Sequence, residues 1–183
     1  MHCYRTVKPS YRNARIADLA AEAASKLAEL PFVPKVNFVK LDPYGDVKTA
    51  EHVRDEICAG FVDVFGQGDS KSYEVFVAAD LSASETARIV FHEVRHVQQY
   101  ATGKWKTTTP AQRESDAREF QRLAPTREPW GLVFGEMAFK LAKLALNNGD
   151  LQSARRYCVE LSTVNPDAAW KINALIKESE AAR

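Results

Sequence analysis

The chain has 183 residues, 45% of them apolar, and a formal net charge of +1 at pH 7. A chain of this length and apolar content can bury one hydrophobic core and a small additional unit. A net charge close to zero gives no reason to expect nucleic acid or an anionic membrane surface as a partner.

The first helix and the first strand are predicted before residue 41. Residues 13 to 30 place alanine, leucine and isoleucine at helical spacing, which predicts a helix that is ended by Pro31 and Pro34. Residues 35 to 41 have the alternation of a strand, and residues 42 to 46 have turn composition.

A hairpin is predicted next. The segment from 49 to 58 is ambiguous, and we expect a short helix there. Residues 60 to 65 and 73 to 79 are rich in valine and aromatic side chains, and the glycine-rich segment 66 to 70 between them has turn chemistry.

The segment after the hairpin is predicted to be a long amphipathic helix. Ser82 and Glu85 have the spacing of a capping box, and Gly103 is a natural stop past the last turn. One face can be buried because apolar residues recur at helical spacing, at Val90, Val94 and Val97.

This helix contains the pattern His92-Glu93-x-x-His96. Residues four apart lie on one face of a helix, so the two imidazoles can bind one metal ion. Glu93 is close enough to reach a water on that metal without having to bind it. The alternative is a chance match, in which both histidines only make ordinary hydrogen bonds.

A third ligand is needed, because catalytic zinc has three protein ligands and one open position. A capping threonine followed by proline predicts a helix over residues 109 to 123, ending before Pro125. Glu114 and Asp116 flank its apolar stripe, and either carboxylate could be the ligand. The stripe consists of Ala117, Phe120, Leu123 and Ala124.

The two helices together resemble zincin metallopeptidases of the gluzincin type, in which a glutamate on a following helix completes the zinc site. The resemblance lies in the His92-Glu93-x-x-His96 motif and in Glu114-x-Asp116-Ala117 with Phe120, within residues 73 to 125. It implies Zn²⁺ as cofactor, His92, His96 and Glu114 as ligands, Glu93 as general base, and a peptide or protein as substrate. Residues 113 to 125 are also similar to ImmA/IrrE-like peptidases.

The chain departs from the family pattern at one position. Some gluzincins have an aspartate four residues after the ligand glutamate to orient a histidine, and here that position is Arg118. Asp116 is a candidate for orienting a histidine in its place, or it pairs with Arg95. Tyr100, one turn beyond His96, is a candidate donor to a developing oxyanion, with a packing role as the alternative.

Two further features bear on substrate binding. In zincin-like folds an edge strand above the metal can add an extended peptide as one more strand. The strand before the motif helix is our candidate, through Tyr73, Val75 and Val77, although it could equally bind no ligand. Trp105, between the two metal-bearing helices, either walls the cleft or anchors its loop to the core.

After Pro129 only helices are predicted, over residues 130 to 147, 151 to 161 and 167 to 180. The stretch from Leu144 to Ala154 is weakly similar to a tetratricopeptide hairpin. A lone helical hairpin cannot bury its apolar face by itself. We therefore expect these helices to bind a protein partner, to form a dimer interface, or to cover the sheet or the motif helix.

The cysteines bear on the cellular compartment. They are odd in number and widely separated, and none has a histidine at zinc-finger spacing; they are Cys3, Cys58 and Cys158. This is typical of free thiols in a reducing compartment. No apolar run of signal-peptide or membrane-helix length is present, so we expect a cytoplasmic protein with no membrane partner.

Together these patterns predict an α+β fold with two parts. Residues 1–125 would form a zincin-like domain with a small mixed sheet and an active-site helix, and residues 126–183 an all-helical C-terminal extension. The predicted function is a zinc-dependent metallopeptidase. The alternative is a non-catalytic binding protein that uses the C-terminal helices and has a vestigial or structural metal site.

Overall fold

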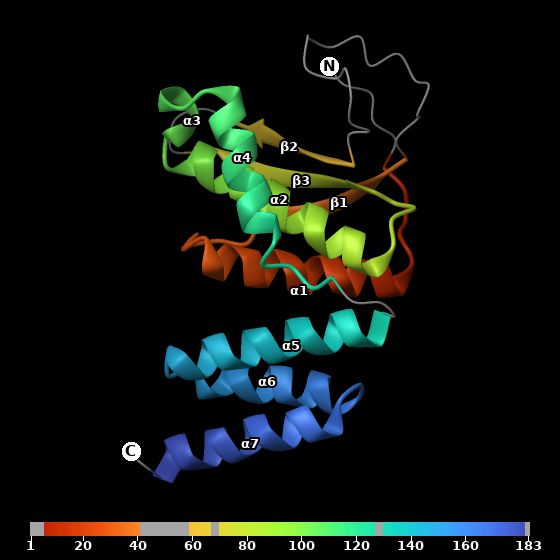
Figure 1. Cartoon of the computed structure of the whole chain (residues 1–183), viewed down its shortest axis with the longest axis vertical. Coiled ribbons are helices and arrows are strands. Elements are labelled where there is room, and N and C mark those ends of the chain that lie inside the picture. Colours follow the sequence, from red (N-terminus) through yellow and green to blue (C-terminus); the bar gives the residue numbers. More distant parts are fainter. Residues whose placement is uncertain (1–5, 41–58, 67–69, 127–129, 182–183) are drawn as a thin grey trace.

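The computed structural model describes residues 6–40, 59–66, 70–126 and 130–181. Over these residues the chain is an α+β protein with a three-stranded mixed sheet and seven helices, stacked in layers (Figure 1). The predicted fold class is confirmed. The expected turn at 42 to 46, the expected helix at 49 to 58, and Cys3 and Cys58 lie outside the described residues, as does the centre of the hairpin turn.

The sheet consists of β1 (Lys35–Val39), β2 (Gly60–Phe65) and β3 (Ser72–Ala78), in the order β1-β3-β2. β3 is parallel to β1 and antiparallel to β2. The three predicted strands and the hairpin are therefore confirmed to within two residues at each end.

The prediction of β3 as an edge strand for substrate is wrong. β3 lies in the centre of the sheet, with β1 and β2 hydrogen-bonded on its two sides, so its backbone has no room for a further strand. Val75 and Val77 are fully buried in the hydrophobic core. Tyr73 stacks on Phe32, with ring centroids 5.6 Å apart. Among the described strands, β2 forms the edge on the far side of β3 from β1.

Two long helices pack together and contact the sheet. α1 (Tyr11–Leu27) begins two residues earlier than predicted, because the hydroxyl of Ser10 caps it by accepting from the backbone N–H of Asn13. α2 (Ala83–Ala101) is the motif helix, and it follows β3 directly. Its predicted capping box at Ser82 is present, and the chain leaves it through Gly103 at a φ of 76°.

Two shorter helices lie beside α2. The segment after Gly103 forms a single helical turn, α3 (Lys104–Thr107), and α4 (Pro110–Gln121) packs against α2. Thr109 caps α4 in a capping box and Pro110 occupies its first turn, as predicted. Leu123 is 45% exposed, so its place in the predicted apolar stripe is wrong: α4 ends before it and the chain changes direction.

The C-terminal helices form a layer on the far side of α1 from the sheet (Figure 1). They are α5 (Trp130–Asn147), α6 (Leu151–Ser162) and α7 (Pro166–Ala181), close to their predicted bounds. α5 packs along α1 and also contacts α2, and α6 is tied to α1 by an ion pair of 2.9 Å between Arg15 and Glu160. The helices mainly cover α1, which was not among the expected surfaces, and only α5 also contacts the motif helix.

None of the helices in the described part of the chain combines the length and apolar character needed to cross a bilayer.

Candidate metal centre

His92, His96 and Glu114 converge on one point between α2 and α4. The Nε2 atoms of the two histidines are 3.1 Å apart. The carboxylate of Glu114 spans both, with Oε1 3.2 Å from Nε2 of His96 and Oε2 3.4 Å from Nε2 of His92. Of the two carboxylates left open by the sequence, Glu114 reaches the histidines, whereas Asp116 is directed to Arg95.

The spacing of these atoms suits zinc. Ligand atoms about 2.0 to 2.1 Å from a tetrahedral zinc ion lie about 3.3 Å from one another. The two histidine nitrogens are 3.1 Å apart, and they lie 3.2 and 3.4 Å from different oxygens of Glu114, so the two nitrogens and a carboxylate oxygen could hold one ion. The side chain of Glu114 is 50% exposed while that of His96 is 8% exposed, so the cluster is buried on the α2 side and open toward solvent. Two imidazoles and one carboxylate with an open side form a donor set typical of catalytic zinc.

Glu93 lies beside this cluster in a buried position, with 6% of its surface exposed. Burial raises the pKa of Glu93 to about 7, which the charges of His92 and His96 partly oppose and the charge of Glu114 reinforces. A carboxyl group with a pKa near neutrality can both accept and return a proton under ordinary conditions. This is the property required of the predicted general base.

Mutual hydrogen bonding sets the charge of the ligands. The hydrogen bonds from His92 and His96 hold the pKa of Glu114 far below its ordinary value. Burial lowers the pKa of His96, but the hydrogen bonds to Glu114 and Gln99 and the charge of Glu93 outweigh this, and the pKa is raised overall. Glu114 is therefore an ionised carboxylate, the form that binds a cation.

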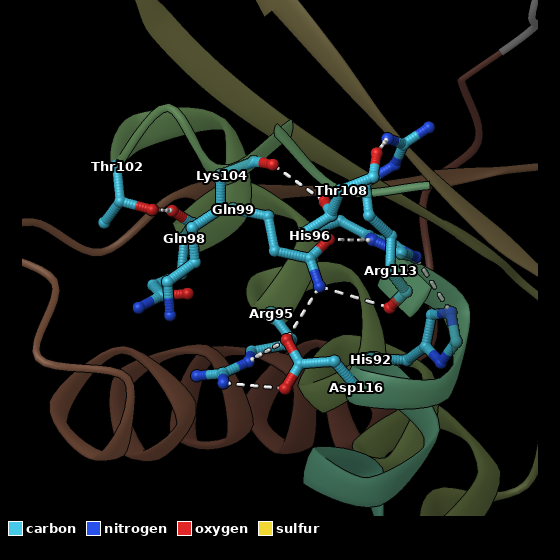
Figure 2. A network of polar contacts seen from close by, with 10 residues as sticks. All are labelled: His92, Arg95, His96, Gln98, Gln99, Thr102, Lys104, Thr108, Arg113 and Asp116. Atoms are coloured by element: carbon cyan, nitrogen blue, oxygen red, sulfur yellow. Dashed lines mark hydrogen bonds and ion pairs between the residues drawn. The ribbon is translucent and has the colours of Figure 1, made fainter. Parts of the chain in front are cut away.

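Nδ1 of His96, the ring nitrogen that does not face Glu114, contacts a residue that the sequence analysis missed. Nδ1 of His96 is 2.9 Å from Oε1 of Gln99, and Nε2 of Gln99 donates to Oδ2 of Asp116 at 2.8 Å and to the backbone oxygen of Arg113 at 3.1 Å (Figure 2). Asp116 also accepts two hydrogen bonds of 2.8 Å from Arg95. Asp116 thus pairs with Arg95, as one alternative held, and reaches the histidine only through Gln99.

Gln99 could have been found by its spacing. It follows His96 by three residues, which puts both side chains on the same side of a helix. A polar residue at that position has an imidazole as its neighbour, and in the folded chain Gln99 is 2% exposed.

Nδ1 of His92, the ring nitrogen that does not face Glu114, lies close to a second glutamine. Nδ1 of His92 is 3.1 Å from the side-chain amide of Gln121, which lies on α4 one turn after Arg118. Both ends of this amide are satisfied when its nitrogen donates to His92 and its oxygen accepts from Arg88 at 3.0 and 3.3 Å. Gln121, rather than the residue at position 118, is thus the α4 side chain that faces this ring nitrogen.

An aromatic wall borders the cluster on the α3 side. The ring of Trp105 meets His96 edge-on, with centroids 5.9 Å apart, and stacks on Tyr100 at 3.8 Å. The guanidinium of Arg113 lies 4.0 Å from the centroid of the Trp105 ring. Of the two roles considered for Trp105, the structure therefore supports a wall beside the histidine.

Tyr100 lies at the end of this wall. Burial raises its pKa above the ordinary value, so its hydroxyl keeps the proton that a hydrogen-bond donor needs. Its role toward an oxyanion stays a prediction. On its other side is a cavity of about 480 Å³, lined in part by Tyr100, Tyr73 and Phe32. Tyr73 is thus the one member of the predicted substrate strand that lines an open space.

Comparison of the chain with family models, with curated proteins and with solved structures finds no match. The functional assignment therefore depends on the geometry of this centre.

Proposed function

We propose that the protein is a zinc-dependent metallopeptidase of the zincin class, acting on a peptide or protein substrate. The observation that carries this proposal is the His92, His96 and Glu114 cluster, in which two imidazole nitrogens 3.1 Å apart lie within 3.4 Å of the oxygens of one carboxylate, a donor set typical of catalytic zinc. The buried Glu93 beside it supports catalysis over a structural metal, because a structural zinc has no use for a general base.

The residues of the chain would divide the reaction as follows. When bound, zinc supplies a water whose pKa is lowered to about 7 and polarises the scissile carbonyl. Glu93 takes the proton released at that water and delivers it to the leaving amine nitrogen. Tyr100 is the candidate donor to the developing oxyanion. Peptide-bond hydrolysis needs each of these roles.

β2 is the edge strand of the described sheet that touches α2 beside Glu93, at Gly60, so it is the strand nearest to the proposed base. We infer a cytosolic location from the cysteine usage, with Cys158 a free thiol.

The proposal is tested by measuring zinc content and peptide hydrolysis on the parent protein and on three variants. The parent should hold about one zinc per chain and hydrolyse a peptide library, and His96→Ala should lose both properties. Glu93→Gln should keep the zinc and lose turnover. Glu119→Gln is the matched control, because that side chain is 71% exposed and pairs only with Arg122 among the interactions described.

The main competitor is a binding protein that uses the C-terminal helices. Trp170 on α7 and Val159 on α6 are 72% and 67% exposed, as expected of side chains that could contact a partner. No zinc in the parent after the metal is added back, or zinc without any hydrolysis, would favour this alternative. In that case partner binding should be unchanged by Glu93→Gln.

A further inference from the structure

We propose that the cavity beside Tyr100 is a subsite for the substrate, and that it holds an aromatic side chain about three residues from the bond that is cleaved. This subsite depends on the proposed peptidase function and deepens it, because it names the class of side chain that the substrate carries. The walls of the cavity, its volume and its distance from Glu93 support it.

The cavity lies where three segments meet, near α3 at one side of the molecule (Figure 1). These segments are the end of α1 with the loop that follows it, the start of β3 and the end of α2. Stacked aromatic rings contribute to its walls. Tyr73 and Phe32, whose ring planes are 5° apart, both line it, and so does Tyr100, which stacks on Trp105. A further ring placed among them would gain aromatic contacts in addition to the apolar area that it buries.

The charges around the cavity favour a neutral ligand. Glu29 and Lys71 both line it and are both exposed, so one carboxylate and one ammonium group border the same space. Because these charges are opposite, they give no net attraction for an acidic or a basic side chain. The other polar side chains of the lining, those of Gln98 and Thr102, are neutral.

The volume of the cavity suits one residue of a peptide. It is about 480 Å³, within the range of about 300 to 1,000 Å³ that is usual for ligand-binding cavities. A space of this size can hold a large side chain together with the backbone that bears it.

The cavity is next to the wall of the metal centre. The ring of Trp105 meets His96 edge-on, with centroids 5.9 Å apart, and stacks on Tyr100 at 3.8 Å. Since Tyr100 also lines the cavity, the cavity lies directly beyond this aromatic wall. A peptide bound at the metal centre therefore needs to extend past only one row of rings to reach it.

Helix geometry gives the distance between the cavity and the reacting bond. Tyr100 follows Glu93 by seven residues on α2, which corresponds to about 10 Å along the helix axis. An extended peptide advances about 3.3 Å per residue, so about three residues separate a bond beside Glu93 from a side chain in the cavity. β2 spans a similar interval, since it begins at Gly60 against Glu93 and its Val64 is paired with Tyr73.

The first test measures which peptides are cleaved. A peptide library treated with the zinc-loaded parent and read by mass spectrometry should show phenylalanine, tyrosine or tryptophan enriched at one position, about three residues from the cleaved bond. In a single peptide from that set, replacing the aromatic residue by alanine should lower kcat/KM at least about 10-fold, because the alanine leaves the cavity unfilled.

A variant that fills the cavity ties this preference to the site. Ala101 is the last residue of α2, is exposed and lines the cavity, so Ala101→Phe should occupy it and the aromatic and alanine peptides should then be cleaved equally well. The matched control is Ala181→Phe, at the exposed last residue of α7 in the distant C-terminal layer (Figure 1), which should keep the parent's preference. Phe32→Ser removes one wall and should also reduce the preference, which keeps the test decisive if Ala101→Phe does not fold.

Binding to the metal-free protein is the second readout. N-acetyl-tyrosinamide should shift the backbone amide resonances of residues 28–32 and 98–102 in ¹H–¹⁵N spectra, because these segments line the cavity. N-acetyl-alaninamide should leave them unchanged, and Ala101→Phe should abolish the shifts.

Two results overturn the subsite: an aromatic preference that is absent from the parent or survives in both cavity variants, or amide shifts that the two probes produce equally. Hydrolysis of peptides without the preference would overturn the subsite and leave the proposed function standing. A parent that binds N-acetyl-tyrosinamide in the cavity but takes up no zinc and cleaves no peptide would instead overturn the proposed function.

Discussion

Gly60 on β2 lies directly against Glu93 on α2. A β-carbon at residue 60 would be 3.1 Å from both Cγ and Oε1 of Glu93, and 2.5 Å from Cγ2 of Ile89. The 2.5 Å contact is shorter than a methyl group allows and the two 3.1 Å contacts are tight, so the side chains of Ile89 and Glu93 would have to shift to admit a β-carbon at residue 60. The position of the proposed general base therefore depends on the start of β2.

Replacing this glycine should damage catalysis without removing the metal. In Gly60→Ala the new methyl group must push Ile89 and Glu93 aside, and overpacking of this kind costs about 1 to 3 kcal/mol of stability. A displacement of the base by about 1 Å can lower the rate about 100-fold. We expect zinc content to be unchanged while kcat falls.

The matched control for this substitution is Gly131→Ala, because a β-carbon there would meet nothing within 4 Å. It should keep full activity and slightly raise stability, since alanine has the higher helix propensity. Full activity in Gly60→Ala would show that Glu93 is not held by β2.

Glu114 and Asp116 on α4 should have different effects in a metal-binding experiment. Glu114→Gln replaces a carboxylate whose two oxygens lie 3.2 and 3.4 Å from the histidines, so zinc should be lost or bound in a small fraction of chains. Asp116→Asn weakens the pairing with Arg95 and the support of Gln99 but leaves the Glu114 carboxylate in place, so one zinc per chain should still bind, about 10- to 100-fold more weakly. Elemental analysis with equilibrium dialysis measures both, and the reverse order of losses would make Asp116 the ligand.

Burial of Glu93 should make the stability of the metal-free protein depend on pH. Its pKa is about 7 in the folded chain and 4.5 when unperturbed. Between these values the unfolded state releases the proton while the folded state retains it, so this group lowers the free energy of unfolding as pH rises from 4.5 to 7. A shift of this size corresponds to roughly 3 kcal/mol.

The contribution is isolated by comparing parent and Glu93→Gln in denaturant titrations of chelator-treated protein. The glutamine variant should lack this decline. The free energy of unfolding of the parent should therefore fall relative to that of Glu93→Gln as pH rises across the window, and the difference should level off above about pH 7. His96 and Glu114 titrate in both proteins, which removes most of their effect from the difference. A gap that does not vary with pH would show that the carboxyl ionises freely in the folded state.

The C-terminal helices should be required for the N-terminal part, up to residue 125, to fold. α5 packs along α1, and α6 adds the Arg15–Glu160 ion pair, so a chain ending at residue 125 would expose the face of α1 that they cover. We expect that fragment to lack a cooperative thermal transition by circular dichroism. A chain ending at residue 165 loses only α7 and keeps this face covered, so it should retain a transition and bind zinc. A stable fragment 1–125 would make the predicted domain boundary an autonomous one.

Much of the secondary structure and the metal motif could be predicted because their determinants are local. The capping boxes at Ser82 and Thr109 act within one helical turn, and so does the spacing that brings His92 and His96 together. Strand composition located β2 and β3 for the same reason.

The order of the strands was decided only by tertiary structure. β3 was expected at an edge because it precedes the motif helix, but its composition suits a strand that is buried between two others equally well. Pairing with β1 joins residues 39 positions apart in the chain, such as Lys35 and Glu74, and no local pattern records which sides of a strand are occupied.

The sequence by itself determined the two candidate ligand histidines, the proposed base, the helices that bear them and two candidate carboxylates. Only the tertiary structure decided that Glu114 faces the histidines, that Asp116 pairs with Arg95, and that Gln99 lies against His96. The physical reason is that periodicity fixes which residues share a face of a helix, whereas the rotation of α4 against α2 follows from how the two helices pack.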